Sequence, residues 1–509
     1  MNTPVRVFCN TIVLYVKIIV SILVGLYLTR IVLDVLGIED FGIYNLIAGV
    51  IAVLAFIESS LMMSTQRYLS LALGEGDQGR VREYFSAGLQ IHIIIALLIA
   101  AILELCGLFL FDGFLNIPTD RVIIARQIYQ LMILSTCITM IGIPFNAIIN
   151  AYEDIWFYGL LQIFCIIARL GIIFGFTYIF LDSLLLYTIW IMSTTIIGVV
   201  VSIVWCYFKY DTTHRLTLSP QKSWNKIREM LSFTGWNTFG AFAVVCRNQG
   251  ISVVLNVFFG PAINGVFGIA NQVDGQLISF ANTLTSSMTP QIVKSQGQGN
   301  SDRLRKLSVF ACKMAFLLSA FFALPLMIEL PLVLSMWLKE VPPYAELYCR
   351  VILFTFLICE FYPGLARGIQ AVGVIKWQQI WSSTCILAPI PIGVILFKIG
   401  MPHYTITYLM VIAQICSFAV FVYWAWRLYG LKVSEFLSFV FKSTLIFVGL
   451  LYAGFMADEF LEGKITDIVR FLLVCSVSSF VFVIMFCKFC FKEYERDTII
   501  NLIHQIKKK

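Results

Sequence analysis

Five ionisable residues stand near the middle of long apolar stretches of this chain: Lys17, Arg169, Arg247, Asp274 and Glu360. Charged groups inside a lipid bilayer are costly, so they usually face a polar cavity or pair with one another. The arginine fork binds phosphate through two hydrogen bonds, and a buried carboxylate can exchange a proton near neutral pH. The group therefore predicts either a cavity for an anionic ligand or internal ion pairs that fasten a helical bundle.

Polar side chains close to these charges extend the predicted binding surface. Lys17 shares one side of its helix with Asn10 and Ser21, and it lies too far from either helix end to reach water by snorkelling. Amide side chains recur at helical spacing around Arg247 and Asp274, where they can bond either ligand hydroxyls or neighbouring helices. The predicted substrate-binding residues are Lys17, Arg169, Arg247, Asn248, Asn271 and Asn282.

Three acidic residues are predicted to couple transport to an ion: Glu58, Asp274 and Glu360. Glu58 is followed by two serines deep in an apolar segment, which favours a buried carboxylate that binds and releases a proton. The alternative is that each acid simply pairs with a nearby Lys or Arg. Loss of pH dependence in a Glu58→Gln variant would separate the two interpretations.

The composition identifies the elements that must position these residues. Of the 509 residues, 60% are hydrophobic and 13% are charged, with a mean hydropathy of +0.89. Such a chain is too apolar for a soluble domain and predicts an all-α polytopic membrane protein. The net charge of +7 is interpreted as loop charge that sets topology, so no nucleic-acid partner is expected. The scattered cysteines and the lack of a phosphate-binding-loop motif predict no metal site and no cofactor.

Apolar windows predict about fourteen transmembrane helices, and the basic residues between them set their orientation. Most Lys and Arg residues fall in the even-numbered loops, which places these loops, both termini and the tail Lys507–Lys509 in the cytoplasm. We predict a six-helix lobe over 1–208, a cytoplasmic linker over 209–229, a second six-helix lobe over 230–430, and two extra helices with a tail over 431–509. The predicted helices span 7–33, 41–63, 87–111, 122–146, 156–180, 184–208, 230–258, 262–288, 307–337, 344–366, 378–399, 404–427, 434–456 and 467–490.

An internal repeat relates the two predicted lobes. Residues 37–82 align without gaps to residues 260–305 at an offset of 223, with ten identities in 46 positions. Gly37 matches Gly260, and the loop arginines Arg80 and Arg82 match Arg303 and Arg305. Six helices per half is an even number, so the halves share one orientation, which predicts a parallel repeat about an axis along the membrane normal.

The segments LGIEDFGIYNLI (36–47) and STQRYLSLALGEGD (64–77) carry a family resemblance. With the helix plan, they make the chain resemble the O-antigen and capsule repeat-unit flippases of the multidrug/oligosaccharidyl-lipid/polysaccharide exporter superfamily. The resemblance implies a two-lobed fold like that of the multidrug and toxic compound extrusion (MATE) transporters. It also implies transport by alternating access of an undecaprenyl-diphosphate-linked oligosaccharide across the bacterial inner membrane. A proton or sodium ion and other polysaccharide-assembly proteins are the implied partners.

Three other functions stay open at this stage. A multidrug/cation antiporter on the same fold would favour a pocket dominated by carboxylates, whereas three of the five central charges are basic. A lipid II flippase would differ only in the glycan it carries. A membrane glycan polymerase or glycosyltransferase would need a larger extracytoplasmic loop than any predicted here. We therefore expect a transporter rather than an enzyme.

Overall fold

The computed structural model describes residues 3–52, 55–111, 118–173, 176, 182–211, 220–338, 341–461, 464, 466–491, 493 and 495. All regular structure within these ranges is helical. Nine of the described helices are long and apolar enough to cross a membrane, or ten if one bent pair forms a single span. The all-α membrane fold is thus confirmed, while the count of fourteen stays a prediction. The predicted cytoplasmic Lys507–Lys509 lies outside the described residues.

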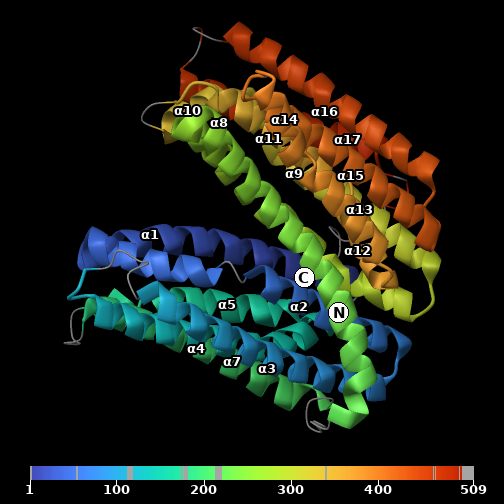
Figure 1. The fold of residues 1–509 in the computed structure, drawn as a ribbon. Helices are drawn as coiled ribbons and strands as arrows, with labels where there is room; N and C mark the ends of the chain where they lie inside the picture. Colours follow the sequence, from blue (N-terminus) through green and yellow to red (C-terminus); the bar gives the residue numbers. More distant parts are fainter. Residues whose placement is uncertain are drawn as a thin grey trace. The chain divides into compact units, whose positions relative to one another are not determined.

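The chain divides into two compact units, one formed by Arg6–Thr238 and the other by Phe239–Lys509 with Met1–Val5. The boundary falls inside one long helix, α8, which begins in the first of these units and continues in the second (Figure 1). The helices up to this boundary are α1 (Thr3–Ala52), α2 (Ala55–Glu75), α3 (Gln78–Phe109), α4 (Val122–Ala151), α5 (Ile155–Arg169), α7 (Ser183–Lys209) and the start of α8 (Pro220–Gly297). The other unit continues with α9 (Ser301–Ile328), α10 (Leu330–Trp337), α11 (Ala345–Cys359), α12 (Pro363–Val372), α13 (Lys376–Leu387), α14 (Pro389–Lys398), α15 (Thr405–Tyr429), α16 (Val433–Leu461) and α17 (Asp467–Phe489).

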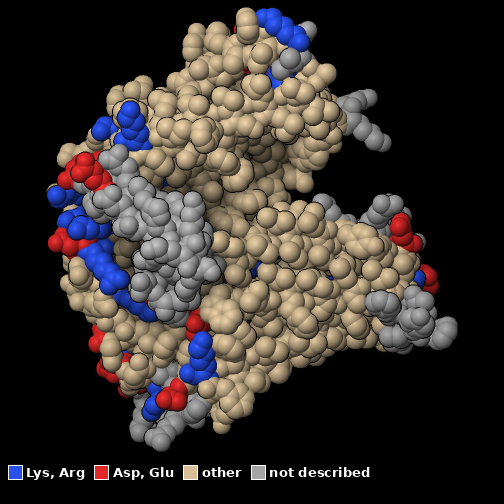
Figure 2. Space-filling view, turned by 180° about the vertical axis from the view of Figure 1, so that it is seen from behind, with Lys and Arg blue, Asp and Glu red and all other residues tan. Residues whose placement is uncertain are grey.

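The outer surfaces of the bundles are largely apolar. In Figure 2 broad faces are tan, and most blue and red side chains gather along the margins of the view. Large apolar side chains of the described helices are strongly exposed, for example Phe109 at 75% and Phe441 at 70%. Exposed apolar side chains along helices are typical of a lipid-facing surface, because the hydrocarbon of the bilayer takes the place of a protein core around them.

The predicted repeat has a conformational counterpart at Gly37 and Gly260. α1 is sharply kinked at Gly37, where φ is 76° and ψ is 170°, and α8 is kinked at Gly260, where φ is 82° and ψ is −179°. This backbone region is accessible essentially to glycine alone. The two glycines are equivalent in the alignment, so the same hinge occurs at the same point of both repeats.

A second correspondence lies at the other end of each repeat. Gly76 and Gly299 both take positive φ values, of 76° and 67°. Asp77 then caps α3 by accepting from the Arg80 amide at 3.0 Å, and Asn300 caps α9 by accepting from the Arg303 amide at 2.9 Å. Capping by Asp or Asn satisfies a helix-end N–H group. Both matched loop motifs, GEGD and GQGN, therefore encode a glycine turn followed by a helix cap.

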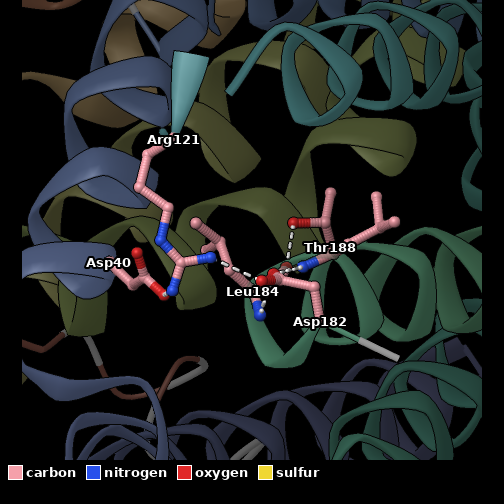
Figure 3. A network of polar contacts seen from close by, with 6 residues as sticks. Asp40, Arg121, Asp182, Leu184 and Thr188 are labelled. Carbon is pink, nitrogen blue, oxygen red and sulfur yellow. Dashed lines mark hydrogen bonds and ion pairs between the residues drawn. The ribbon is translucent and has the colours of Figure 1, made fainter. Parts of the chain in front are cut away.

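One acidic residue of the first family segment, Asp40, belongs to a polar network that joins α1, just after its kink at Gly37, to the starts of α4 and α7 (Figure 3). Arg121, just before α4, donates from Nη2 to Asp40 Oδ2 at 2.8 Å and from Nη1 to Asp182 Oδ2 at 2.5 Å. The other oxygen of Asp182 accepts from the amides of Leu184 and Leu185 and so caps α7. The hydrogen bond with Asp182 raises the pKa of Arg121 above its usual value, so the guanidinium stays charged.

Asp182→Ala should lower the free energy of unfolding by about 1–2 kcal/mol, because it removes a helix cap and one arm of a half-exposed ion pair. Asp182→Ser should recover about half of the loss, since serine caps a helix but cannot pair with Arg121. Thermal and denaturant unfolding in detergent would measure both effects. Asp120→Ala is the matched control; if it costs as much as Asp182→Ala, the network does not stabilise this end of the unit.

Several predicted continuous spans are broken in the structure. The span 307–337 stops at Ile328, and α10 restarts at Leu330 with a proline in its first turn. The span 344–366 is interrupted between α11 and α12, which are bent by 40°. The span 156–180 was expected to hold Arg169 near its middle, but α5 ends at that residue. Proline and local hydrogen bonding create such breaks, but the residues around them stay apolar, so a hydropathy window does not detect them. The prediction that Arg169 lies in the middle of a helix was therefore wrong.

Candidate substrate and ion sites

The hinge in α8 brings two of the predicted site residues together. Arg247 and Asp274 lie before and after Gly260, and their separation of 27 positions would span about 40 Å in a straight helix. Instead the two side chains lie close enough to interact electrostatically. Ser252 bridges the same hinge, since its hydroxyl bonds Asn264 Oδ1 at 2.6 Å. The two arms of α8 therefore run back along one another and present Arg247 and Asp274 to a common site.

Glu360 enters this site from the break between α11 and α12. It directly follows the last residue of α11, is 6% exposed, and interacts electrostatically with Asp274. The break exists because Pro363 begins α12 and cannot donate a hydrogen bond back into α11. We refer to Arg247, Asp274 and Glu360 as the α8 charge cluster. It combines one cation with two carboxylates.

Three side chains that the sequence did not indicate, Tyr362, Gln414 and Phe421, complete the surroundings of the α8 charge cluster. Tyr362 lies two residues after Glu360, interacts electrostatically with Arg247, and accepts a hydrogen bond from Gln414 on α15. Its ring stacks on Phe421 with the centroids 4.4 Å apart. Arg247 Nε also donates to Asn248 Oδ1 at 3.0 Å, which joins two predicted binding residues. Tyr362 lies in an apolar segment, and a tyrosine there does not indicate from sequence alone that it contacts a charged site.

The two carboxylates of the cluster keep unused hydrogen-bonding capacity. Among the described residues, Asp274 Oδ1 and Glu360 Oε2 are buried without a hydrogen-bond partner. Buried polar atoms are normally paired, and an unpaired one points to strain, a missing ion or a proton. No group of three or more metal-binding side chains occurs within the described part of the chain.

Lys17 occupies a separate site in the unit Arg6–Thr238. Its Nζ lies 6.0 Å from the centre of the Tyr158 ring on α5, within cation–π range. The helices approach closely here because of Gly159, where a Cβ atom would stand 2.5 Å from Val13 Cγ1. Lys17 is half-buried, so its ammonium group stays accessible beside the Tyr158 ring. No carboxylate among the described residues forms an ion pair with it.

Asn10, expected on the same polar side as Lys17, serves a structural purpose instead. It is 1% exposed, donates to the Glu153 carbonyl at 3.1 Å and accepts from the Trp156 amide at 3.0 Å. It therefore clamps α1 to the turn before α5. Asp154 of that turn pairs with Lys209 at 2.9 Å and accepts from the Tyr210 hydroxyl at 2.6 Å. The hydrogen bonds of Asn10 are therefore structural, and the role of Lys17 on the same side of the helix stays a prediction.

Arg169 lies beside an aromatic pair at the end of α5. It interacts electrostatically with Tyr44 and Tyr187, whose ring centroids are 5.0 Å apart in an edge-to-face arrangement. Tyr44 belongs to the first family segment, and Arg169 Nε is buried without a hydrogen-bond partner among the described residues. Lys17 and Arg169 are thus two cations placed against tyrosines, and no described carboxylate neutralises either of them.

Three predicted residues are not joined to a cluster. Glu58 lies 21 residues after the Gly37 hinge and Lys17 lies 20 residues before it, yet no electrostatic interaction between them is found. Asn271 is half-buried on α8 and Asn282 is exposed there. No side-chain contact within the described part of the chain assigns Glu58, Asn271 or Asn282 a role, so their parts in binding or coupling stay predictions.

Comparison with known families identifies the chain. Residues 6–296 match the model of a family described as polysaccharide biosynthesis proteins, which is more than half of the chain. The chain belongs to this family. A second family model, MatE, matches residues 251–395 of this polysaccharide biosynthesis protein. The two matches make it a multi-pass membrane protein of the polysaccharide exporter group.

The chain also resembles one curated membrane protein in sequence and several solved transporter structures in fold. The uncharacterized membrane protein EpsK of Bacillus subtilis (strain 168) is 22% identical over 311 residues, which cover 59% of each chain. A MATE protein in the straight conformation has a similar structure, with a TM-score of 0.71 at 16% identity, covering 85% of this chain and 97% of that one. An outward-facing multidrug resistance MATE transporter gives 0.68 at 16% identity, with 84% and 97% covered. A transporter of the same superfamily from Pyrococcus furiosus, with a binding pocket of reversed polarity, gives 0.66 at 16% identity, with 85% and 96% covered.

Proposed function

We propose that this chain is a flippase for lipid-linked oligosaccharides. In this proposal it moves undecaprenyl-diphosphate-linked repeat units from the cytoplasmic to the periplasmic leaflet of a bacterial inner membrane, for O-antigen or capsular polysaccharide. Both termini lie in the cytoplasm, and transport proceeds by alternating access. Family membership supports a role in transport for polysaccharide biosynthesis. The identity of the substrate goes beyond family membership and is part of the proposal.

The observation that carries the substrate proposal is the pair of cations Lys17 and Arg169, each set against a tyrosine and away from described carboxylates. A diphosphate group needs permanent positive charge where water is scarce. Tyrosine rings and hydroxyls beside those cations can stack on sugars and bond their hydroxyl groups. The same unit carries both family segments, so the proposed diphosphate-binding residues belong to the part of the chain that matches the polysaccharide family.

In the same proposal, the α8 charge cluster couples transport to an ion gradient. Its two carboxylates hold oxygens without a described hydrogen-bond partner, and Arg247 is close enough to Asp274 to change the affinity of that carboxylate for a proton or sodium ion. Arg247 is also proposed as a substrate contact, and a phosphate bound to it would compete with Asp274 for the guanidinium. Phosphate and carboxylate then compete for one arginine, so substrate binding changes the affinity of the carboxylate for the ion, which is the differential interaction that alternating access requires.

A second candidate is a multidrug/cation antiporter of the same fold. The excess of carboxylates in the α8 charge cluster and the likeness to MATE transporters favour it. This function would use the acids for both the drug and the ion, and it would leave Lys17 and Arg169 as structural cations. The two candidates therefore differ in what binds to the protein.

Native mass spectrometry of the protein purified in mild detergent should distinguish them. The flippase proposal expects a retained polyprenyl-diphosphate glycan, and Lys17→Ala should lower its retention about tenfold, the effect of one charge-assisted bond. Lys398→Ala, an exposed lysine at the end of α14, is the matched control and should change nothing. Absence of any such lipid, together with stabilisation of the protein by organic cations, would favour the antiporter.

A further inference from the structure

A second charged site lies far along the chain from the predicted transport residues, among α9, α16 and α17. These three helices pack against one another, and α9 and α16 begin at the end of the bundle where α17 finishes. A cavity of about 400 Å³ opens there. Its lining includes five cations and two carboxylates, which leaves an excess of positive charge. The five cations are Arg305, Lys306, Lys313, Lys432 and Lys442.

Most of this charge stands where a ligand can reach it. Arg305 pairs with Asp302 at 2.5 Å and Lys432 pairs with Glu435 at 3.1 Å, but both are ion pairs with at least one well-exposed partner. Such pairs contribute little and are easily exchanged for a stronger anion. Lys442 is exposed, and no carboxylate of the described chain lies within ion-pair distance of it. It is the cation best placed to bind an incoming anion.

The inner end of the cavity is closed by a buried ion pair and aromatic rings. Lys313 bonds Glu495 at 2.6 Å, and both side chains are 4% exposed. Lys313 Nζ also lies 5.8 Å from the ring centres of Phe439 and Phe491. This pair neutralises the innermost charge and fixes the segment after α17 against α9. The cavity is therefore basic at its mouth and apolar deeper in.

The combination of a basic mouth and apolar walls identifies the ligand class. A free phosphate ion would find hydrogen bonds only at the rim, whereas a phospholipid can place its phosphate among the cations and its acyl chains against phenylalanine. Phe489 on the cavity wall is 51% exposed, and Phe441 next to Lys442 is 70% exposed, so the lining continues into the lipid-facing surface. Basic pockets between transmembrane helices on the cytoplasmic side bind acidic lipid headgroups in this way. The loops at this end are the ones expected in the cytoplasm.

We propose that α9, α16 and α17 form a binding site for the headgroup of an anionic membrane phospholipid, with Lys442 and Lys432 as its principal phosphate contacts. The site is separate from the α8 charge cluster and does not depend on which substrate the protein carries. Occupancy of the site tethers the C-terminal helices α16 and α17 to α9 through the lipid. It gives the two helices beyond the predicted second lobe a function of their own.

The test compares lipid retention in the full-length protein. Protein exchanged into micelles that hold equal amounts of phosphatidylglycerol and phosphatidylcholine is analysed by native mass spectrometry. We expect preferential retention of phosphatidylglycerol, an about fivefold fall in that preference for Lys442→Gln, and a further fall for the Lys432→Gln/Lys442→Gln pair. Lys488→Gln is the matched control, because Lys488 is exposed in the last turn of α17 but does not line the cavity.

Three outcomes would overturn the proposal. They are equal retention of the two lipids by the unmodified protein, an equal loss in the Lys488→Gln control, and displacement of the lipid by inorganic phosphate at moderate concentration. The last outcome would mean that the site binds a soluble anion. Thermal unfolding of each variant shows whether it is folded, and Lys442→Gln removes no described ion pair, so its fold should be intact.

Discussion

Alanine at either hinge glycine should destabilise the protein, and alanine at two nearby glycines should do the opposite. For Gly37→Ala and Gly260→Ala we expect a loss of about 1–3 kcal/mol in the free energy of unfolding. No atom lies within 4 Å of the Cβ position at either glycine, so the loss comes from backbone conformation and not from a clash. The φ values of 76° and 82° are ones that an L-residue rarely adopts.

Gly49 and Gly265 provide the matched controls. Gly49 lies 12 positions after Gly37, and Gly265 lies five positions after Gly260. Both have open space at the Cβ position, and neither has a positive φ. Alanine there should raise stability by about 0.4–1 kcal/mol, because it restricts the unfolded chain and favours the helix. Thermal unfolding followed by tryptophan fluorescence would measure all four variants. Equal stabilities for Gly260→Ala and Gly265→Ala would show that the hinge conformation is not required.

Gly260→Ala should also impair transport more than its effect on stability explains. The hinge is what returns the second arm of α8 to the first and places Asp274 beside Arg247. A relaxed hinge would separate these residues along a helix. Expression level and transport measured on the same preparation would distinguish this effect from simple unfolding.

The hinges show how far a sequence alone can lead. The match of Gly37 with Gly260, and of the GEGD and GQGN loops, predicted equivalent units, and the structure gives both pairs the same backbone conformations. Such positions are predictable because a positive φ or a helix cap restricts the residue type directly. Hydropathy likewise identified the membrane-spanning class, since apolar composition follows from the lipid solvent.

The sites were less predictable, because a pattern on one helix does not say which neighbour it meets. Asn10 and Lys17 share a side of α1, yet one clamps a turn and the other faces a tyrosine. Arg67, a cation of the second family segment, is buried in α2, with its guanidinium carbon 4.5 Å from the ring centre of Tyr68 and 4.7 Å from that of Phe233. Long-range packing decides these cases, and a single sequence does not contain it.

Substitutions in the α8 charge cluster should separate substrate binding from ion coupling: changes at Arg247 should affect binding, and changes at Asp274 should affect coupling. Arg247→Ala should lower retention and transport of a lipid-linked glycan about ten- to hundredfold, the effect of losing a charge-assisted bond to phosphate. Arg247→Lys should recover part of it, since it keeps the charge and loses the fork. Arg427→Ala, an arginine in the last turn of α15 that bonds Tyr423, is the matched control.

Asp274→Asn should give the opposite pattern, with glycan retention preserved in detergent and gradient-driven transport lost. The change removes a carboxylate whose Oδ1 has no described hydrogen-bond partner, so the amide fits without breaking a bond. It also frees Arg247 from one competitor, and substrate should therefore bind as well or better while the response to pH or sodium flattens. Glu58→Gln tests the other unit in the same assay. If Asp274→Asn transports with unchanged ion dependence and Glu58→Gln does not, coupling belongs to the unit that holds Lys17, and Asp274 serves only to orient Arg247.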